Sequence, residues 1–173
     1  VKIPIEKFDK GCSFIFGNTF YSILFPRPKL VIIGAVHIAQ YLANFAQMFE
    51  YQIHVIDPRS TFASIKRFPK VKISVEWPDI ALNEASLDKN CALITLTHDP
   101  KIDDVALQKA LHSDCFYIGS LGSTRTHKQR INRFKLLGFE EEQIYRIKGP
   151  VGLDIGAKSP NEIALSIMAE IIS

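Results

Sequence analysis

Glycine-rich turns that precede helices are the parts of this sequence whose residue types suit the binding of a phosphate. In the first turn, "GAVHIA", Gly34 ends an apolar run and His37 opens a helix-compatible stretch. Dinucleotide-binding folds place further glycines in this turn and an acidic residue about 20 positions later. Here Asp57 is suitably placed, with Arg59 close behind it, but Val36 replaces the middle glycine. Three interpretations stay open: a purely structural turn, an NAD(P) site, or another ligand bound in the same crevice.

A second turn, "GSLGS", offers flexible backbone and two hydroxyl groups through Gly119, Ser120, Gly122 and Ser123. It leads into a basic stretch, with five Lys or Arg and no Asp or Glu between residues 123 and 139. Such a segment suits an anionic ligand or an acidic partner surface. Arg125, next to the glycines, is the favoured anion-binding candidate. A solvated helix face is the favoured interpretation of the other basic residues, Lys128, Arg130, Arg133 and Lys135.

Two further polar clusters each have a chemical and a structural interpretation. His98 and Asp99 follow an apolar run and suit either proton transfer or the capping of the next helix. Asp154 and Gly156 lie in "GPVGLDIGAKSP", which either lines a ligand crevice or is only a tight connection. These patterns assign no catalytic residue, and the cysteines lack the spacing of a metal site.

The bulk composition fits one soluble globular domain. The chain has 173 residues, of which 47% are hydrophobic and 23% charged, and its net charge of +3 is too small to predict a nucleic-acid partner. No apolar run has the length of a membrane span, and the first residues lack a signal-peptide pattern. Three widely spaced cysteines favour a reducing compartment, the cytoplasm. Cys91 and Cys115 begin apolar runs and are expected in the core, whereas Cys12 is expected to be more accessible.

Alternating strand and helix patterns predict the elements that position these residues. Apolar runs that begin at residues 29, 52, 71, 91 and 115 read as buried strands. Long helices are expected at 37–49, 101–112, 123–137 and from Pro160 onward, with shorter, less regular helical stretches at 60–68 and 79–86. The last helix has a capping box, made by Ser159 and Glu162.

This order of elements predicts an α/β fold, a doubly wound and mostly parallel sheet of the Rossmann type. "SFIFGNTFYSILF" predicts a hairpin around Gly17, so residues 1–28 are expected to be an N-terminal β-hairpin arm and 29–173 the Rossmann-like domain. In the usual strand order, the runs that begin at 29, 91 and 115 end side by side. Ligands of such sheets bind at that edge.

Five segments together resemble the C-terminal domain of the XdhC/CoxI family, accessory proteins of xanthine dehydrogenase and related molybdenum hydroxylases. The segments are "LVIIGAVHIAQYLA", "HVIDPR", "LTHDPKIDDVALQKAL", "FYIGSLGSTRTHKQRI" and "GPVGLDIGAKSPNEIALSIMAEI". They cover roughly 29–173 in the family's order. The family's first turn usually reads Gly-Ala-Gly-His-Val-Ala, so Gly34, His37 and Ala39 match it and Val36 departs from it. Members usually carry a further N-terminal domain, and the resemblance covers only the C-terminal one.

The resemblance implies a chaperone for the molybdopterin-type molybdenum cofactor, without turnover chemistry of its own. Such a protein binds the cofactor as cargo, assists its sulfuration with a cysteine desulfurase and delivers it to the apo-hydroxylase, commonly as a homodimer. It also implies that the glycine turns and their flanking polar residues hold this cargo. The alternatives from the residues alone remain an NAD(P)-dependent oxidoreductase that uses His98 or His127 as proton donor, and a nucleotide-sensing domain.

Overall fold

The computed structural model describes residues 13–23, 26–84 and 87–173 of the chain. Its first elements are the short strands β1 (Phe14–Phe16) and β2 (Thr19–Tyr21), which pair antiparallel. Gly17 occupies the turn with a φ of 60°, in the left-handed region that glycine adopts at no steric cost. The predicted hairpin is therefore confirmed. Cys12 and the rest of the predicted arm before residue 13 lie outside the described residues.

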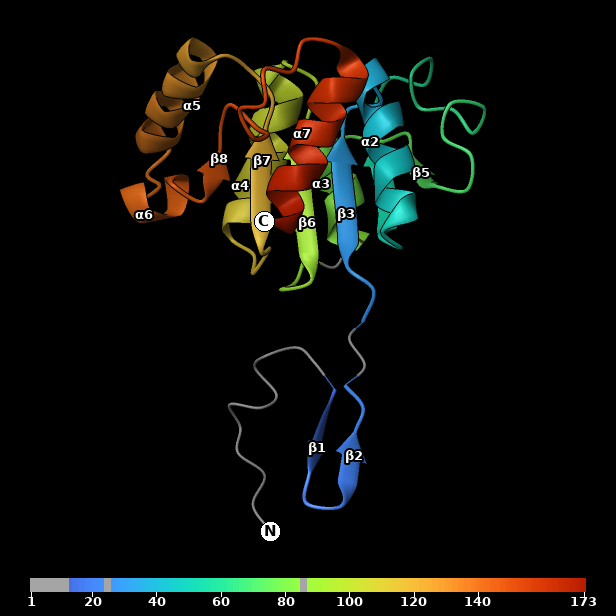
Figure 1. Ribbon diagram of the computed structural model, residues 1–173. Coiled ribbons are helices and arrows are strands. Elements are labelled where there is room, and N and C mark those ends of the chain that lie inside the picture. Colours follow the sequence, from blue (N-terminus) through green and yellow to red (C-terminus); the bar gives the residue numbers. More distant parts are fainter. Residues whose placement is uncertain (1–12, 24–25, 85–86) are drawn as a thin grey trace.

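Six parallel strands form the central sheet (Figure 1), and they confirm the predicted doubly wound fold. Their order is β5-β4-β3-β6-β7-β8, with the topological reversal between β3 and β6. The strands are β3 (Lys29–Ile33), β4 (Gln52–Ile56), β5 (Lys72–Ser74), β6 (Cys91–Thr95), β7 (Tyr117–Ser120) and β8 (Ile147–Lys148). The two-residue β8 was not predicted, because a strand this short leaves no apolar run in the sequence.

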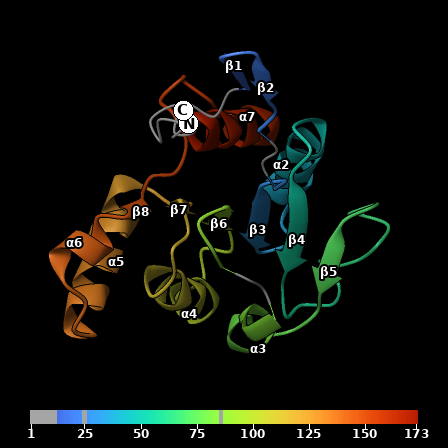
Figure 2. The ribbon, with the colours of Figure 1, turned by 90° about the horizontal axis from the view of Figure 1, so that it is seen from below.

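Helices cover both faces of the sheet (Figures 1 and 2). One face carries α2 (His37–Met48) and α7 (Pro160–Ile172), which pack closely on each other. The other carries α3 (Pro78–Glu84), α4 (Pro100–Leu111) and α5 (Thr124–Leu136), with the single turn α6 (Glu141–Ile144) beside α5. The four long helices match the predicted ranges to within a residue or two. Residues 60–68 form turns and bends instead of the expected short helix.

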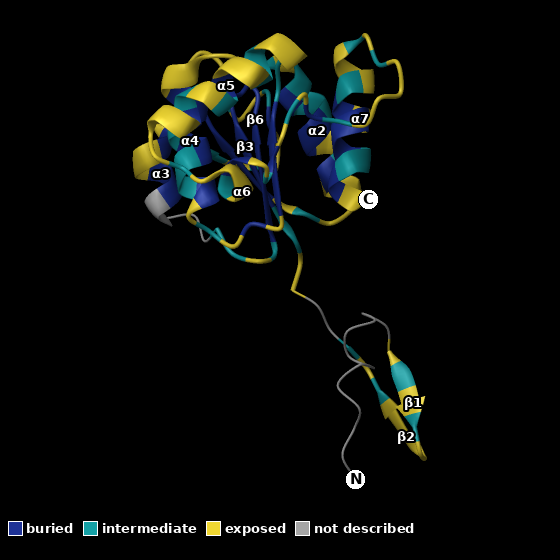
Figure 3. Cartoon of the chain, turned by 90° about the vertical axis from the view of Figure 1, so that its left-hand side faces the viewer, coloured by how far each residue is buried: buried dark blue, intermediate teal, exposed yellow. Residues whose placement is uncertain are grey.

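Two apolar layers hold the sheet between the helices, and Figure 3 shows them as the buried interior. Side chains alternate along each strand, so Leu30 and Ile32 face α2 and α7 while Val31 and Ile33 face α3 and α4. Both Cys91 and Cys115 are buried in the second layer, as predicted. The capping box of α7 is present: Ser159 and Glu162 satisfy each other's backbone amides. No helix among the described residues is long and apolar enough to cross a membrane.

His54 gives the sheet a pH-dependent stability. Its imidazole is buried in β4, where Nε2 lies 2.8 Å from the Ser74 hydroxyl. Burial, and then the charge of Lys72, lower the pKa of His54 to about 4. The unfolded chain takes up a proton near pH 6.5 and the folded chain does not, so this residue makes the free energy of unfolding fall as the pH drops from 6.5 to 4.

We therefore expect His54→Gln to flatten the fall in stability over that window. Urea unfolding of the wild type and the variant at several pH values between about 7 and 4 measures the difference. Subtracting the free energies of unfolding of the two proteins at each pH leaves the contribution of His54, because the carboxylates that titrate in this range are the same in both. Two parallel profiles would show that this imidazole is charged in the fold.

Candidate functional site

The carboxyl ends of β3, β6 and β7 lie side by side, as the strand order predicted, and two adjoining cavities open there. The switch-point cavity has a volume of about 260 Å³ and lies over β3 and β6. The glycine-loop cavity has a volume of about 520 Å³ and lies between the loop after β7 and the loop before α7. Leu121 lines both cavities, so together they form one crevice at the topological switch point, the usual ligand position of such sheets.

Gly34 is required by the backbone of the first turn. Its φ is 102°, and its amide donates to the carbonyl of Ile56 at 2.8 Å. A Cβ at this position would lie 2.6 Å from Cγ2 of Thr97 and 3.2 Å from the Thr97 backbone nitrogen. The turn therefore passes against the end of β6 at a distance that only glycine permits.

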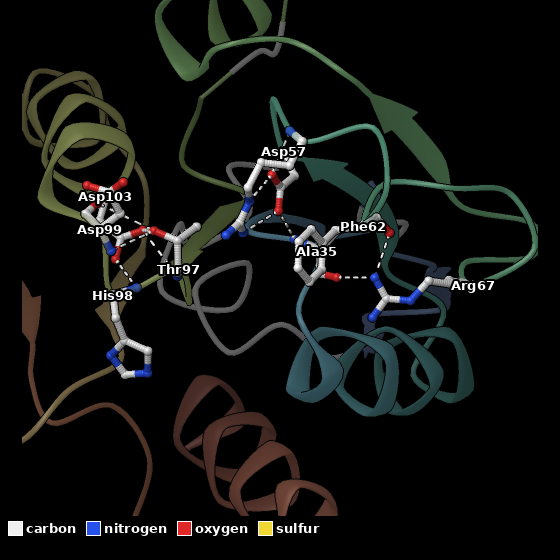
Figure 4. A network of polar contacts seen from close by, with 9 residues as sticks. Ala35, Asp57, Phe62, Arg67, Thr97, His98, Asp99 and Asp103 are labelled. Carbon is white, nitrogen blue, oxygen red and sulfur yellow. Dashed lines mark hydrogen bonds and ion pairs between the residues drawn. The ribbon is translucent and has the colours of Figure 1, made fainter.

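Asp57 holds this turn and is saturated by protein donors (Figure 4). Its Oδ2 accepts from the Ala35 amide at 2.7 Å and from Arg59 Nη2 at 2.7 Å. Its Oδ1 accepts from the backbone amide and from Nε of Arg59, at 2.9 and 2.8 Å. Burial would raise the pKa of Asp57, but the hydrogen bonds from Arg59 and Ala35 hold it below its usual range. Both carboxylate oxygens are thus occupied, and a ribose hydroxyl would have to displace one of these donors.

Arg67 secures the opposite side of the same turn, and no sequence pattern pointed to it. Its Nη1 donates at 2.7 Å to the carbonyls of both Ala35 and Phe62 (Figure 4). The Phe62 ring lies 4.5 Å from the Arg59 guanidinium and 5.7 Å from that of Arg67. Residues 59 to 67 have no regular secondary structure, so the sequence shows no periodicity there. They nevertheless hold the turn after β3 through contacts with residues far away in the sequence.

After this turn, α2 begins beside the switch-point cavity, which Val36, His37 and Ile38 line. Val36 is the N-cap and makes no side-chain cap. The N-terminal amides of such a helix attract anions. His37 is exposed, with Nδ1 3.2 Å from Oε1 of Gln40. The Val36 side chain takes up space between a ligand and these amides. The family motif has glycine at this position.

His98 faces the same cavity from the loop after β6, and Asp99 does not. His98 has a φ of 63°, an uncommon value for a residue with a side chain, and its exposed imidazole lines the switch-point cavity. Asp99 caps α4 by accepting from the Lys101 amide at 2.9 Å, which matches the structural one of its two interpretations. His98 and Asp99 are therefore neighbours in sequence with different roles.

Asp103 is the buried residue that fixes this loop, and it was not singled out in the sequence. Its carboxylate accepts from the Thr97 hydroxyl at 2.7 Å, from the Thr97 amide at 3.3 Å and from the His98 amide at 3.0 Å (Figure 4). Burial raises the pKa of Asp103, against the effect of the Thr97 hydrogen bonds and the nearby Arg130 charge. An acid in the first turn of α4 reads as an ordinary helix-dipole residue, which explains why the sequence pattern did not mark it.

The "GSLGS" loop is more internally bonded than its sequence suggests. Ser120 is buried, with its hydroxyl 2.5 Å from that of Thr95, and Gly119 lies in β7 beneath Val151. Ser123 caps α5 by accepting from the Thr126 amide at 3.1 Å. Gly122 lines the glycine-loop cavity, and Arg125 is exposed on the first turn of α5. Of this set, Gly122 lines a cavity, whereas Arg125 is exposed but lines neither of the two cavities.

The basic helix face is not uniformly solvated, which corrects the sequence-based interpretation. Arg130 is only 2% exposed, and its Nη2 donates to the Leu121 carbonyl at 3.2 Å. Arg133 forms a two-pronged ion pair with Asp104, at 2.6 and 3.0 Å, and Lys135 pairs with Glu141. Lys128 is exposed as expected. Among the described residues, Nε and Nη1 of Arg130 and Nδ1 of His127 are buried without a hydrogen-bond partner.

The loop before α7 forms the outer wall of the crevice. Asp154 and Gly156 are exposed and line the glycine-loop cavity. Gly152 anchors the loop, because its amide donates to Oε2 of Glu170 at 2.7 Å and its φ is 101°. The Tyr117 hydroxyl bonds to the same Glu170 carboxylate. The loop is thus fixed at its start by Glu170 of α7, and its later residues Asp154 and Gly156 line the cavity.

Apolar side chains dominate the lining of the whole crevice. In the switch-point cavity the polar lining residues are His37 and His98. In the glycine-loop cavity they are Asp154 and Ser166, beside three glycines and seven residues with apolar side chains. The summed volume falls in the range of small-molecule sites. The described residues show no cluster of three metal-ligating side chains.

Comparison with known proteins identifies the family of the chain. The family model described as the XdhC Rossmann domain matches residues 30–171. The chain is 32% identical over 156 residues to a protein of Bacillus subtilis named as a probable xanthine dehydrogenase component, covering 90% of this chain and 45% of that protein. It is 32% identical over 148 residues to the molybdenum cofactor insertion chaperone PaoD of Escherichia coli, covering 86% of this chain and 40% of that one.

A solved structure agrees with these matches. A crystal structure described as a xanthine dehydrogenase from Bacillus halodurans superposes with a TM-score of 0.74 at 28% identity, covering 89% of this chain and 43% of the other. The chain thus spans less than half the length of these relatives. The matched region includes every strand of the parallel sheet and both cavities. This chain belongs to the XdhC Rossmann-domain family.

Proposed function

We propose that the crevice binds the molybdopterin-type molybdenum cofactor as cargo, and that the protein matures a xanthine dehydrogenase-type hydroxylase in the cytoplasm. In this proposal it assists sulfuration of the cofactor with a cysteine desulfurase, acts as a homodimer, and inserts the cofactor into the apo-enzyme. The observation that carries the proposal is the pair of adjoining cavities at the switch point, both lined mainly by apolar side chains, with three glycines in the larger one. The names of the family relatives point to the same cargo and recipient.

The residues present fit such a cargo in chemical type. The pterin has flat rings with polar edges, which suit the apolar walls between Val36 and Leu121 and the imidazoles of His37 and His98. The phosphate or dinucleotide part is assigned to the glycine-loop cavity, which Gly122, Asp154 and Gly156 line. Arg125 lies outside that lining, exposed on the first turn of α5, and the proposal has it reach the phosphate from there. Neutral amide hydrogen bonds contribute about 0.5–1.5 kcal/mol net each, so the contacts of a recipient enzyme can overcome them. Such graded affinity is what a carrier requires.

Two features favour this cargo over NAD(P) or a nucleotide signal. Asp57 accepts four protein hydrogen bonds, so its carboxylate is committed to the turn. Val36 lines the cavity where a dinucleotide fold brings its pyrophosphate closest to the backbone. We therefore assign Asp57 and Arg59 to shaping the turn that the ligand contacts, with no direct contact to a ribose.

Direct binding tests the proposal. The purified chain is incubated without oxygen with molybdopterin cofactor released from a molybdoenzyme, passed through a gel-filtration column, and oxidised so that any retained pterin becomes fluorescent. We expect pterin to co-elute with the protein, and NADH to leave the melting temperature unchanged in a parallel titration. A chain that raises its melting temperature with NADH or a mononucleotide and retains no pterin would belong to the nucleotide-binding alternatives.

Arg125→Ala is expected to weaken retention of the cofactor about 10- to 100-fold, because a hydrogen bond to a charged group contributes about 1.5–3 kcal/mol. Lys128→Ala is the matched control, since Lys128 is exposed on the same helix and one positive charge is lost in each case. Equilibrium dialysis of both variants gives the two dissociation constants. Equal losses would mean that the overall charge of α5 matters and that Arg125 has no specific place in the site.

A further inference from the structure

A second chemically notable cluster lies at the opposite edge of the sheet, where β6 and β7 begin. Cys91 is the first residue of β6, and Cys115 stands two residues before β7. Both thiols are buried, at 0% and 5% exposure, and both belong to the apolar layer beneath α4. Each thiol perturbs the pKa of the other, as neighbouring groups do, and Cys91 Sγ donates to the Ala92 carbonyl at 3.6 Å. The pair lies within one apolar layer, far from the crevice at the carboxyl ends of the strands.

The strand register allows the two sulfurs to be joined. β6 and β7 pair in parallel with Ala92 opposite Tyr117, and the Phe116 amide donates to the Cys91 carbonyl at 3.0 Å. Cys115 is thus offset from Cys91 by one position on the neighbouring strand. With strands about 4.8 Å apart and a rise of about 3.3 Å per residue, their Cα atoms are about 6 Å apart. Disulfides span Cα separations of about 4.4–6.8 Å. Cys115 precedes the regular part of β7, and its side chain lies in the same apolar layer as that of Cys91, so the two sulfurs are on the same side of the sheet.

Cys115 borders a cavity at this edge of the sheet. Cys115, together with Phe116, Tyr145 and Arg146, lines a cavity of about 370 Å³ between β7, β8 and α6. The Arg146 guanidinium donates to the carbonyls of Leu111, Ser113 and Cys115, so a fixed positive charge stands beside this thiol. Cys91 is fully buried and is not among the residues that line this cavity. A small reagent that enters the cavity therefore meets Cys115 first.

We propose that Cys115 and Cys91 form an oxidisable dithiol that a hydroperoxide converts to a disulfide. The Cys115 thiolate attacks the O–O bond, which gives a sulfenic acid on Cys115 and releases water or an alcohol. The Cys91 thiol then attacks the Cys115 sulfur, the S–S bond forms, and the sulfenic oxygen leaves as water. The two cysteines lose two electrons and two protons in total, and the hydroperoxide takes them up.

The charges around the two thiols also favour Cys115 as the residue that attacks the hydroperoxide and Cys91 as the residue that then forms the disulfide. The neighbouring Cys91 thiol, aided by Ser113 and the Arg146 charge, lowers the pKa of Cys115 despite its burial. The neighbouring Cys115 thiol and burial raise the pKa of Cys91. A thiolate is the attacking form of a cysteine, and its attack is faster in an electropositive, accessible setting. Cys115 is accordingly the attacking residue and Cys91 the resolving one.

The test uses the whole chain in a Cys12→Ser background, so that Cys91 and Cys115 are the remaining cysteines. The folded protein is treated with hydrogen peroxide, quenched with a thiol-alkylating reagent and analysed by mass spectrometry without reduction. We expect loss of both free thiols, a mass decrease of two hydrogen atoms, and a peptide pair cross-linked through Cys91 and Cys115. Both thiols remaining free, at a peroxide dose that oxidises the same chain in urea, would overturn the proposal.

Single variants separate the two roles. In Cys91→Ala, Cys115 should stop at the sulfenic acid, which a dimedone probe traps. In Cys115→Ala, Cys91 should remain a free thiol under the same treatment. Labelling of Cys91 in the second variant at the rate of Cys115 in the first would reject the order of attack. The cross-link in the parent protein decides the main point even if a variant fails to fold, and because the pair lies opposite the crevice, the result is independent of cofactor binding.

Discussion

Asp103→Ala is expected to lower the free energy of unfolding by about 2–6 kcal/mol, because each buried hydrogen-bonding group left unsatisfied costs about 1–3 kcal/mol and Asp103 accepts from two residues. Asp103 is 1% exposed and accepts hydrogen bonds from Thr97 and from the His98 amide. Its loss leaves these donors unsatisfied in the interior. It also removes an acid that faces Arg130, itself buried and only partly hydrogen-bonded.

Asp99→Ala is the matched control for this prediction. Asp99 lies four residues earlier, caps the same helix and is exposed, so its loss should cost about 1 kcal/mol. Urea unfolding followed by circular dichroism gives both values. Similar losses in the two variants would show that the Asp103 network contributes no more than a surface cap. An intermediate value for Asp103→Asn would assign part of the effect to charge, because the amide keeps one acceptor oxygen.

Asp103→Ala is also expected to change the shape of the crevice, because Asp103 interacts with the loop after β6 and with Arg130 of α5. Through the His98 amide it holds that residue at its positive φ. Through its attraction for Arg130 it acts on the guanidinium that donates to the Leu121 carbonyl. His98 and Leu121 both line the switch-point cavity. We therefore regard Asp103 and Arg130 as positioning residues that connect the loops after β6 and β7.

Local patterns were enough to predict five of the six parallel strands and most helices, whereas the order was taken from the usual arrangement of such sheets. β3, β4, β6 and β7 were readable because a parallel strand buried on both faces must be largely apolar, and β5, which is half-buried, was the weakest of the five. The end of α5 at Gly138 and the capping box of α7 were likewise readable, because caps depend on residues a few positions apart. By contrast, β8 and α6 are too short to give a periodic signal.

The site was predictable only to the level of its loops. The pairing of Asp57 with Arg59 is local, but the contact between Arg67 and the Ala35 carbonyl joins residues 32 positions apart. No pattern in a single sequence encodes such a pair. The burial of Arg130 did leave a signal, because it lies one helical turn before Phe134 and hence on the same, inward face of α5. Reading charge without periodicity missed it.

The second large effect concerns Gly34, where two independent costs coincide. Gly34→Ala places a side chain at a φ of 102°, a left-handed conformation that costs an alanine about 1–2 kcal/mol. The new Cβ also lies 2.6 Å from Cγ2 of Thr97, and overpacking of this kind costs about 1–3 kcal/mol. We expect a total loss of about 2–5 kcal/mol in stability, with loss of cofactor binding, since the turn leads into the first amides of α2.

Gly138 provides the control that separates the two costs. It has a φ of 86°, and a Cβ there meets no atom within 4 Å, so Gly138→Ala should show the conformational cost alone. Thr97→Ser removes the methyl group that the Gly34→Ala side chain would strike, and it keeps the hydroxyl that bonds to Asp103. The double variant Gly34→Ala/Thr97→Ser should therefore recover stability toward the Gly138→Ala value, as a double-mutant cycle would measure. Additive losses in that cycle would mean that the turn relaxes away from β6, and that the close approach is not what demands glycine at position 34.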